Sequence, residues 1–187
     1  MHVNSKLATA PELLDFWFSP RVEKLWFNST PEFDEELRGR FAETYEAACR
    51  AELDHWQTIA HGALALVILF DQIPLNIFRK QAQSFASEAR ARAVAAHAIA
   101  QGFDTELSDP QKAFLYMPYM HSETLADQDR SVELFRLAGL SNNLRFAEHH
   151  HEIVRRFGRF PHRNAILGRD STPEELAWLA SKEAFLG

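Results

Sequence analysis

Cysteine, glycine and long apolar stretches are all scarce in this chain of 187 residues. The single cysteine, Cys49, excludes an internal disulfide framework and a cysteine-rich zinc site. The seven glycines lie mostly between periodic segments, which argues against a turn-rich β fold. The longest apolar run, residues 63–70, is far shorter than the roughly 20 residues of a membrane span, and the N-terminus lacks the apolar core of a signal peptide. The sequence therefore predicts a soluble cytoplasmic protein with no membrane partner.

Helical periodicity dominates the residues that are present. Hydrophobic residues make up 46% of the chain, with 15 Phe and 4 Trp, which is ample for a core. No strand-like alternation competes with the helical spacing, and no low-complexity linker divides the chain. We predict an all-α fold of about eight helices that forms a single domain over residues 1–187, with a flexible N-terminus over about residues 1–10.

Start and stop signals define the expected helices. The segment at 58–72 is apolar nearly all round, so it should lie at the centre of the fold and end at Pro74. Pro118 should kink or split the helix that begins near Ser108. Gly139 and Gly158 should end the helices at 127–137 and 142–157 as C-caps. The remaining helices are expected at 11–18, after Thr30, at 84–101 and after residue 171.

The stretch from His149 to Arg169 is the most basic part of an acidic chain. It holds five arginines, four histidines, one glutamate and no lysine, whereas the whole chain has a formal net charge of -6. Arginines used without lysines are typical of planar, forked donors that bind carboxylates or phosphates. We expect the loop at 158–168 to fold inward against acidic helix residues. The candidate partners are Asp71, Glu123 and Asp127.

Three polar residues stand where helical spacing calls for apolar ones. Asp71 continues an apolar stripe near the end of its helix, where the macrodipole disfavours negative charge, so it needs a positive partner or several donors. His121 should share a helix face with Phe114, Leu125 and Gln128. His150 shares its face with apolar residues of the following turns. Each histidine either donates to a buried acceptor or lines a cavity.

No established catalytic or metal-binding motif is present. The three consecutive histidines at 149–151 diverge by 100° steps on a helix and cannot all face one ion, so no metal site is predicted. Nucleotide-cradling glycine motifs and the GxSxG elbow are also missing, and no cofactor is expected. The acidic balance makes nucleic acid an unlikely partner by charge. The sequence does not define the oligomeric state.

Five blocks of the chain resemble a known bacterial family. They are DFWF (15–18), LFDQIPLNIFR (69–79), FLYMPYMHSETLADQDRSVELF (114–135), HHEIVRRFGRFPHRNAILGR (150–169) and STPEE (171–175). The chain is similar over nearly its whole length to the bacterial domain of unknown function 924. That resemblance implies a tetratricopeptide-like helical array with no established activity. It also shows two departures: Leu75 replaces a usual arginine, and Lys80-Gln81 replaces a common Gly-Thr.

Three hypotheses follow. The first is a binding module with a polar pocket for an anionic small molecule or acidic peptide. The second is a hydrolase or transferase that acts on a phosphorylated or carboxylated small molecule, with His121 or His150 as general base and Asp71 or Glu123 orienting it. The third is a purely structural polar network with the function on another surface. The expected ligand-binding residues are Asp71, Gln72, Asn76, Arg79, His121, Glu123, Asp127, Gln128, His150, Arg156, Arg159, His162, Arg163 and Asn164.

Overall fold

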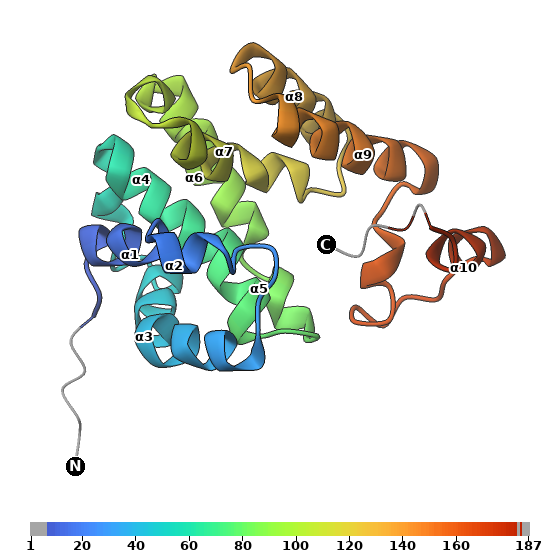
Figure 1. The fold of residues 1–187 in the computed structure, drawn as a ribbon, viewed down its shortest axis with the longest axis horizontal. Helices are drawn as coiled ribbons and strands as arrows, with labels where there is room; N and C mark the ends of the chain where they lie inside the picture. Colours follow the sequence, from blue (N-terminus) through green and yellow to red (C-terminus); the bar gives the residue numbers. More distant parts are fainter. Residues whose placement is uncertain (1–6, 183, 185–187) are drawn as a thin grey trace. The chain divides into compact units, whose positions relative to one another are not determined.

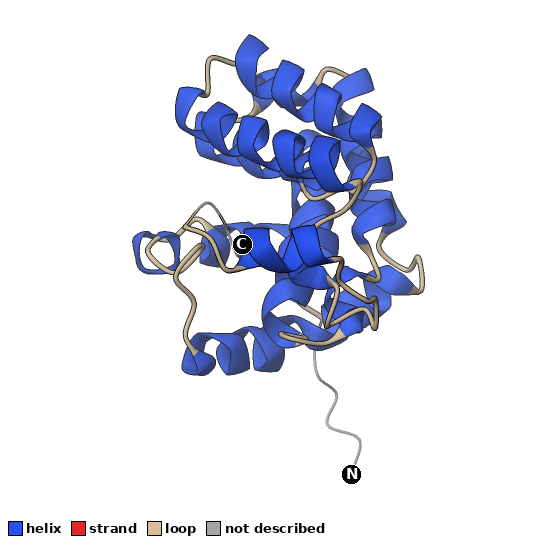
Figure 2. Ribbon diagram, turned by 90° about the vertical axis from the view of Figure 1, so that its right-hand side faces the viewer, coloured by secondary structure: helices blue, strands red, loops and turns tan. Residues whose placement is uncertain are grey.

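The computed structural model describes residues 7–182 and 184, and all regular structure in this part of the chain is helical (Figure 2). The all-α prediction is confirmed. Residues 1–6 lie outside the described residues, so most of the expected flexible N-terminus is not described. The chain divides into two compact units, Met1–Arg79 with Gln83–Leu115 (unit 1) and Lys80–Ala82 with Tyr116–Gly187 (unit 2). The single domain and the tetratricopeptide-like arrangement stay predictions.

Unit 1 is built around one apolar helical segment. Its helices are α1 (Ala10–Trp17), α2 (Pro20–Glu23), α3 (Pro31–Cys49), α4 (Ala60–Val67), α5 (Ile73–Ile77) and α6 (Glu88–Ala100) (Figure 1). Short 3-10 turns precede α4, precede α6 and follow α6. Seven of the eight residues of α4 are buried, and α1 and α6 pack against it. As expected from its composition, this segment forms the core of unit 1.

The segment Ala60–Ile77 is the only one among the described residues that is long and apolar enough to cross a membrane. Of this segment, 89% is buried inside the protein. Such burial is typical of the core helix of a soluble protein. The cytoplasmic location stays a prediction.

Pro74 does not end the central helix, which corrects the sequence-based expectation. Ile68–Gln72 form a π-helical turn, in which the Ile73 amide donates to the Ile68 carbonyl, five residues earlier. Pro74 then occupies the first turn of α5, where a missing amide hydrogen costs no hydrogen bond. The wider turn therefore lets the chain remain helical across the proline.

Unit 2 contains the end of α7 (Asp109–Met120), together with α8 (Leu125–Leu137), α9 (Ser141–Phe157) and α10 (Pro173–Leu179). Helix α7 is continuous across Pro118, so the expected split does not occur. Helices α8 and α9 lie side by side (Figure 1). A small apolar cluster of Ile153, Val154, Phe160 and Trp178 joins α9 to the following loop and to α10.

Helix ends follow the sequence signals closely. Gly158 caps α9 with a φ of 69°, and Gly139 follows α8 with a φ of 70°; both lie in the left-handed region that glycine adopts without strain. Thr172 and Glu175 form a capping box at the start of α10. Lys80 has a φ of 64°. A side chain in this conformation is strained, whereas glycine adopts it without strain.

Candidate functional site

The predicted polar residues of unit 1 form one hydrogen-bonded chain along the π-turn and α5. Gln72 Nε2 donates to Asp71 Oδ2 at 2.6 Å, and Asn76 Nδ2 donates to the Gln72 carbonyl at 3.1 Å. Arg79 then donates to Asn76 Oδ1 and, through two nitrogens, to both carboxylate oxygens of Asp34. The structure thus brings Asp71, Gln72, Asn76 and Arg79 together and adds Asp34, which the sequence did not single out.

Asp34 is buried, with 9% of its surface exposed, and it is the anionic partner of Arg79 in this series of hydrogen bonds. Burial would raise the pKa of its carboxyl, but hydrogen bonds from Arg79 and Ser29 outweigh that effect and hold the pKa below its ordinary value. The geometry is that of a structural ion pair that fixes α5 to α3.

The loop after α9 is anchored in unit 2 by Glu123. Arg169 donates to both carboxylate oxygens of Glu123 at 2.7 and 2.9 Å, and the Phe160 amide donates to the same carboxylate at 2.7 Å. Burial would raise the pKa of Glu123, but these donors outweigh it and lower the pKa. Of the three predicted carboxylate partners, Glu123 is thus confirmed as one that binds the loop.

A second carboxylate, Glu175 of α10, binds the same loop. Arg159 Nε and Nη2 donate to its two oxygens at 2.6 and 2.9 Å, and Asn164 Nδ2 donates at 3.2 Å. Glu175 is only 2% exposed. The hydrogen bonds from Arg159, assisted by the Thr172 amide, lower its pKa to about 2. The inward-folded loop was expected, but Glu175 was missed because its spacing also fits the capping box.

The turn between α7 and α8 is held by polar contacts as well. Ser122 Oγ donates to Asp127 Oδ2 at 2.6 Å, and the fully buried Gln128 donates through Nε2 to the carbonyls of Met120 and Ser122. His121 lies on this turn rather than on a continuous helix, so its expected helical face with Leu125 and Gln128 is wrong. The turn arises because helix α7 ends at Met120 and α8 begins only at Leu125.

Two histidines of unit 2 surround Phe160. His150 Nδ1 donates to the Phe146 carbonyl at 2.8 Å, and its ring centroid lies 5.5 Å from that of Phe160; the His162 ring lies 5.6 Å from the same residue. Burial lowers the pKa of His150 to about 3 and that of His162 to about 4. Both imidazoles are therefore neutral at pH 7, and His150 is a weak base.

Two further predicted site residues differ in burial: Arg163 lies in the loop and Arg156 at the end of α9. Arg163 is buried, and its guanidinium carbon lies 4.7 Å above the Phe160 ring. Arg156 is exposed and forms an ion pair at 2.8 Å with the exposed Glu174. Among the described residues, no group of three or more His, Cys, Asp or Glu side chains is placed to hold a metal ion.

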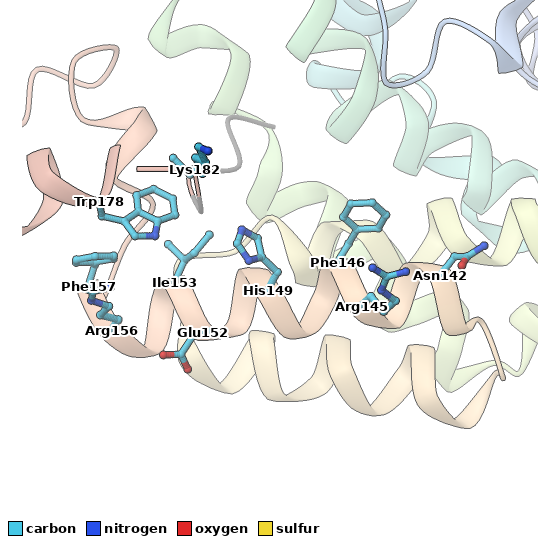
Figure 3. A pocket seen from close by; sticks show the side chains of 11 residues that line it. Asn142, Arg145, Phe146, His149, Glu152, Ile153, Arg156, Phe157, Trp178 and Lys182 are labelled. Carbon is cyan, nitrogen blue, oxygen red and sulfur yellow. The ribbon is translucent and has the colours of Figure 1, made fainter. Parts of the chain in front are cut away.

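A groove of about 900 Å³ lies along α9 in unit 2 (Figure 3). Its apolar lining comes from Phe146, Ile153 and Phe157 of α9 and from Trp178 of α10. The Phe157 and Trp178 rings are 5.6 Å apart, whereas Phe146 is 48% exposed. The groove therefore has a packed aromatic end and an open aromatic end.

The charged lining of this groove is mainly basic. Arg145, Arg156 and Lys182 line it, and Arg145 and Lys182 form no ion pair with any residue that the structure describes. The single lining carboxylate, Glu152, already accepts two hydrogen bonds from Arg155. On the helix it lies within about 40° of Arg145 and Arg156, and its carboxylate points away from His149 and Ile153 (Figure 3). The groove thus offers uncompensated positive charge next to aromatic surface.

Apart from Arg156, the predicted site residues do not line this groove. The signal for it was present in the sequence, because Arg145, Phe146, His149, Ile153 and Arg156 recur at helical spacing. The second wall, with Trp178 and Lys182, comes from a segment that only the fold of the intervening loop brings to α9. The convergence of the predicted residues of unit 1 and unit 2 at one location stays a prediction.

Comparisons with known proteins agree with the helical architecture. A solved structure of a protein of unknown function from Agrobacterium tumefaciens is similar to this chain, with 42% sequence identity and a TM-score of 0.87. The similarity covers 91% of this chain and 96% of that chain. No curated protein matches. The family model described as bacterial protein of unknown function (DUF924) matches residues 13–183, and this chain belongs to that family.

Proposed function

We propose that unit 2 is a binding module that takes an anionic ligand with an apolar part in the groove along α9. The observation that carries the proposal is the pairing of two cations without carboxylate partners, Arg145 and Lys182, with exposed and half-buried aromatic surface. A guanidinium and an ammonium that lack partners attract a carboxylate or phosphate, and Phe146 offers apolar surface to the rest of the ligand.

The proposed binding surface lies outside the arginine-rich loop. The guanidinium groups of Arg159 and Arg169 already bind Glu175 and Glu123 through two nitrogens each. An external anion would have to displace the buried carboxylate of Glu175 or the half-buried carboxylate of Glu123. This pairing favours an architectural role for the loop, which holds the wall of the groove formed by α10.

No observation favours the alternative of a hydrolase or transferase. The pKa of about 3 leaves His150 with little tendency to accept a proton near pH 7. Its Nδ1 proton is also held by the Phe146 carbonyl.

Thermal denaturation with simple probes tests the proposal. 3-Phenylpropionate carries both a ring and a carboxylate, whereas acetate lacks the ring and 3-phenylpropanamide lacks the charge. At ten times its Kd a ligand stabilises the native state by about 1.4 kcal/mol, which is a shift of roughly 3–5 °C for a chain of this size. We expect 3-phenylpropionate to give the largest shift of the three.

The double substitution Arg145→Gln with Lys182→Gln should abolish this shift. The matched control is Lys24→Gln with Arg38→Gln, which removes the same charge from exposed positions of unit 1 and should keep the shift. Equal shifts for 3-phenylpropionate and its amide, or an unchanged shift in the double variant, would contradict the proposal.

A further inference from the structure

We infer that the ligand of this groove is an acidic peptide segment of a partner protein, with acidic residues at both ends and a large apolar side chain between them. This inference rests on the proposed anion-binding function and names the class of ligand. It depends on the spacing of the cations, on the position of the aromatic residues and on the charge of the rest of the protein.

The spacing of the basic residues exceeds the reach of a small anion. Arg145 and Arg156 are eleven positions apart on α9, which corresponds to about 16 Å along the helix axis and to nearly the same face. A single carboxylate or phosphate reaches only one of them. About five residues of extended peptide span this distance.

Arg156 can exchange its partner for such a peptide. Its ion pair with Glu174 joins two side chains that are 42% and 64% exposed, and pairs of this kind contribute little to stability. Arg145 and Lys182 need give up no partner among the described residues. A peptide with a carboxylate at each end would therefore meet basic groups at both ends of the groove.

The aromatic residues lie between these two ends. Phe146 and Ile153 line the groove between Arg145 and Arg156, and Trp178 of α10 lies next to Ile153 and Phe157 (Figure 3). A large apolar side chain in the middle of the peptide would pack here. The groove volume of about 900 Å³ lies near the upper end for small-molecule pockets and suits several residues.

Nucleic acid fits these features less well. The chain has a formal net charge of -6, so a long polyanion that extends beyond the groove is repelled by the remaining surface. Trp178 is only 6% exposed and cannot serve as a stacking platform for bases. A short acidic peptide confines its negative charge to the basic groove.

The test is a fluorescence-anisotropy titration of the full chain with a labelled, end-capped peptide, Glu-Glu-Ala-Phe-Ala-Glu-Glu. We expect the full peptide to bind about tenfold tighter than either of its halves. A peptide with Ala in place of Phe, or with Gln in place of every Glu, should bind at least tenfold more weakly than the full peptide. Arg145→Gln and Arg156→Gln should each weaken binding roughly fivefold. The control Arg38→Gln should leave the affinity unchanged.

The outcomes separate this inference from the proposed function. If 3-phenylpropionate binds but the full peptide binds no tighter than its halves, the peptide inference fails and the anion groove stands. If neither binds, both fail. Tighter binding of a ten-nucleotide single-stranded DNA than of the peptide overturns the inference in favour of nucleic acid.

Discussion

The two units are stabilised by different means. Unit 1 surrounds α4, whose eight residues include seven that are buried, and its main polar chain is confined to the π-turn, α5 and Asp34. In unit 2 the loop after α9 has a small apolar cluster and is held by two carboxylates, Glu123 and Glu175. Unit 1 should therefore respond most to changes in packing, and this loop to changes in charge.

The largest effect is expected from Gly62→Ala in unit 1. A Cβ atom at Gly62 would lie 2.1 Å from the Trp56 carbonyl oxygen, which is backbone and cannot move without shifting the turn before α4. We expect a loss of about 3 kcal/mol in the free energy of unfolding, measured by urea denaturation. Gly39→Ala is the control, because no atom lies within 4 Å of a Cβ there. Similar losses in both variants would contradict the packing account.

Glu175→Ala should have the largest effect of the charge changes in unit 2. It removes the acceptor of Arg159 and Asn164 and one half of the capping box of α10. We expect a loss of about 2 kcal/mol, from the lost cap and the donors left without acceptors. The neighbouring Glu174→Ala removes only an exposed ion pair and should cost less than about 1 kcal/mol. Equal costs would mean that burial of the carboxylate does not matter.

Acid should destabilise unit 2 through its histidines. Burial depresses the pKa of His150 to about 3, so the folded state binds fewer protons than the unfolded state, whose histidine has a pKa near 6.5. The contribution of neutral His150 to the free energy of unfolding is fully present above pH 6.5. It is lost as the pH is lowered toward 3, by about 1.4 kcal/mol per pH unit in the middle of that range. This amounts to about 2 kcal/mol at pH 5. His162, with a pKa of about 4, acts in the same direction.

Denaturation midpoints between pH 7 and pH 4.5 measure this effect. His150→Gln should show a shallower pH dependence than the wild type. The exposed His55→Gln is the control and should keep the wild-type slope. A wild-type slope in the His150 variant would show that another group is responsible.

The smallest effect is a gain in stability from Lys80→Gly. Lys80 occupies a left-handed conformation that a lysine adopts at a cost, and glycine removes most of this cost. We expect an increase of about 0.5–1 kcal/mol, reduced by the greater freedom of glycine in the unfolded chain. Lys24→Gly, at an exposed position with a φ of -71°, should destabilise instead. A loss in both variants would remove the conformational explanation.

Local signals predicted the helix ends well and the polar contacts only in part. Glycines 139 and 158 and the residues Thr172 and Glu175 ended or began helices as expected, because caps depend on neighbours within a few residues. Pro74 and His121 were misjudged. A π-turn lets the helix continue past Pro74. The turn before α8 takes His121 off the helix face that was expected for it. Such adjustments depend on packing that helical spacing does not encode.

The partners of the charged residues were likewise predicted only in part from the sequence. The sequence indicated that the arginines after α9 meet carboxylates, and Glu123 was among the expected partners. It did not distinguish Glu175 from an ordinary capping residue, since the contact to Arg159 joins residues 16 positions apart. It also did not show the groove, whose two walls are α9 and a segment that follows a long loop.

The amino-acid sequence by itself determined the all-helical class, most helix ends and the inward fold of the arginine-rich loop, because these depend on spacing, capping and the need of forked donors for acceptors. Only the tertiary structure decided which carboxylate each guanidinium binds and which cations stay without a partner. Those outcomes depend on the distance between side chains far apart in the chain, and that distance exists only after the helices have packed.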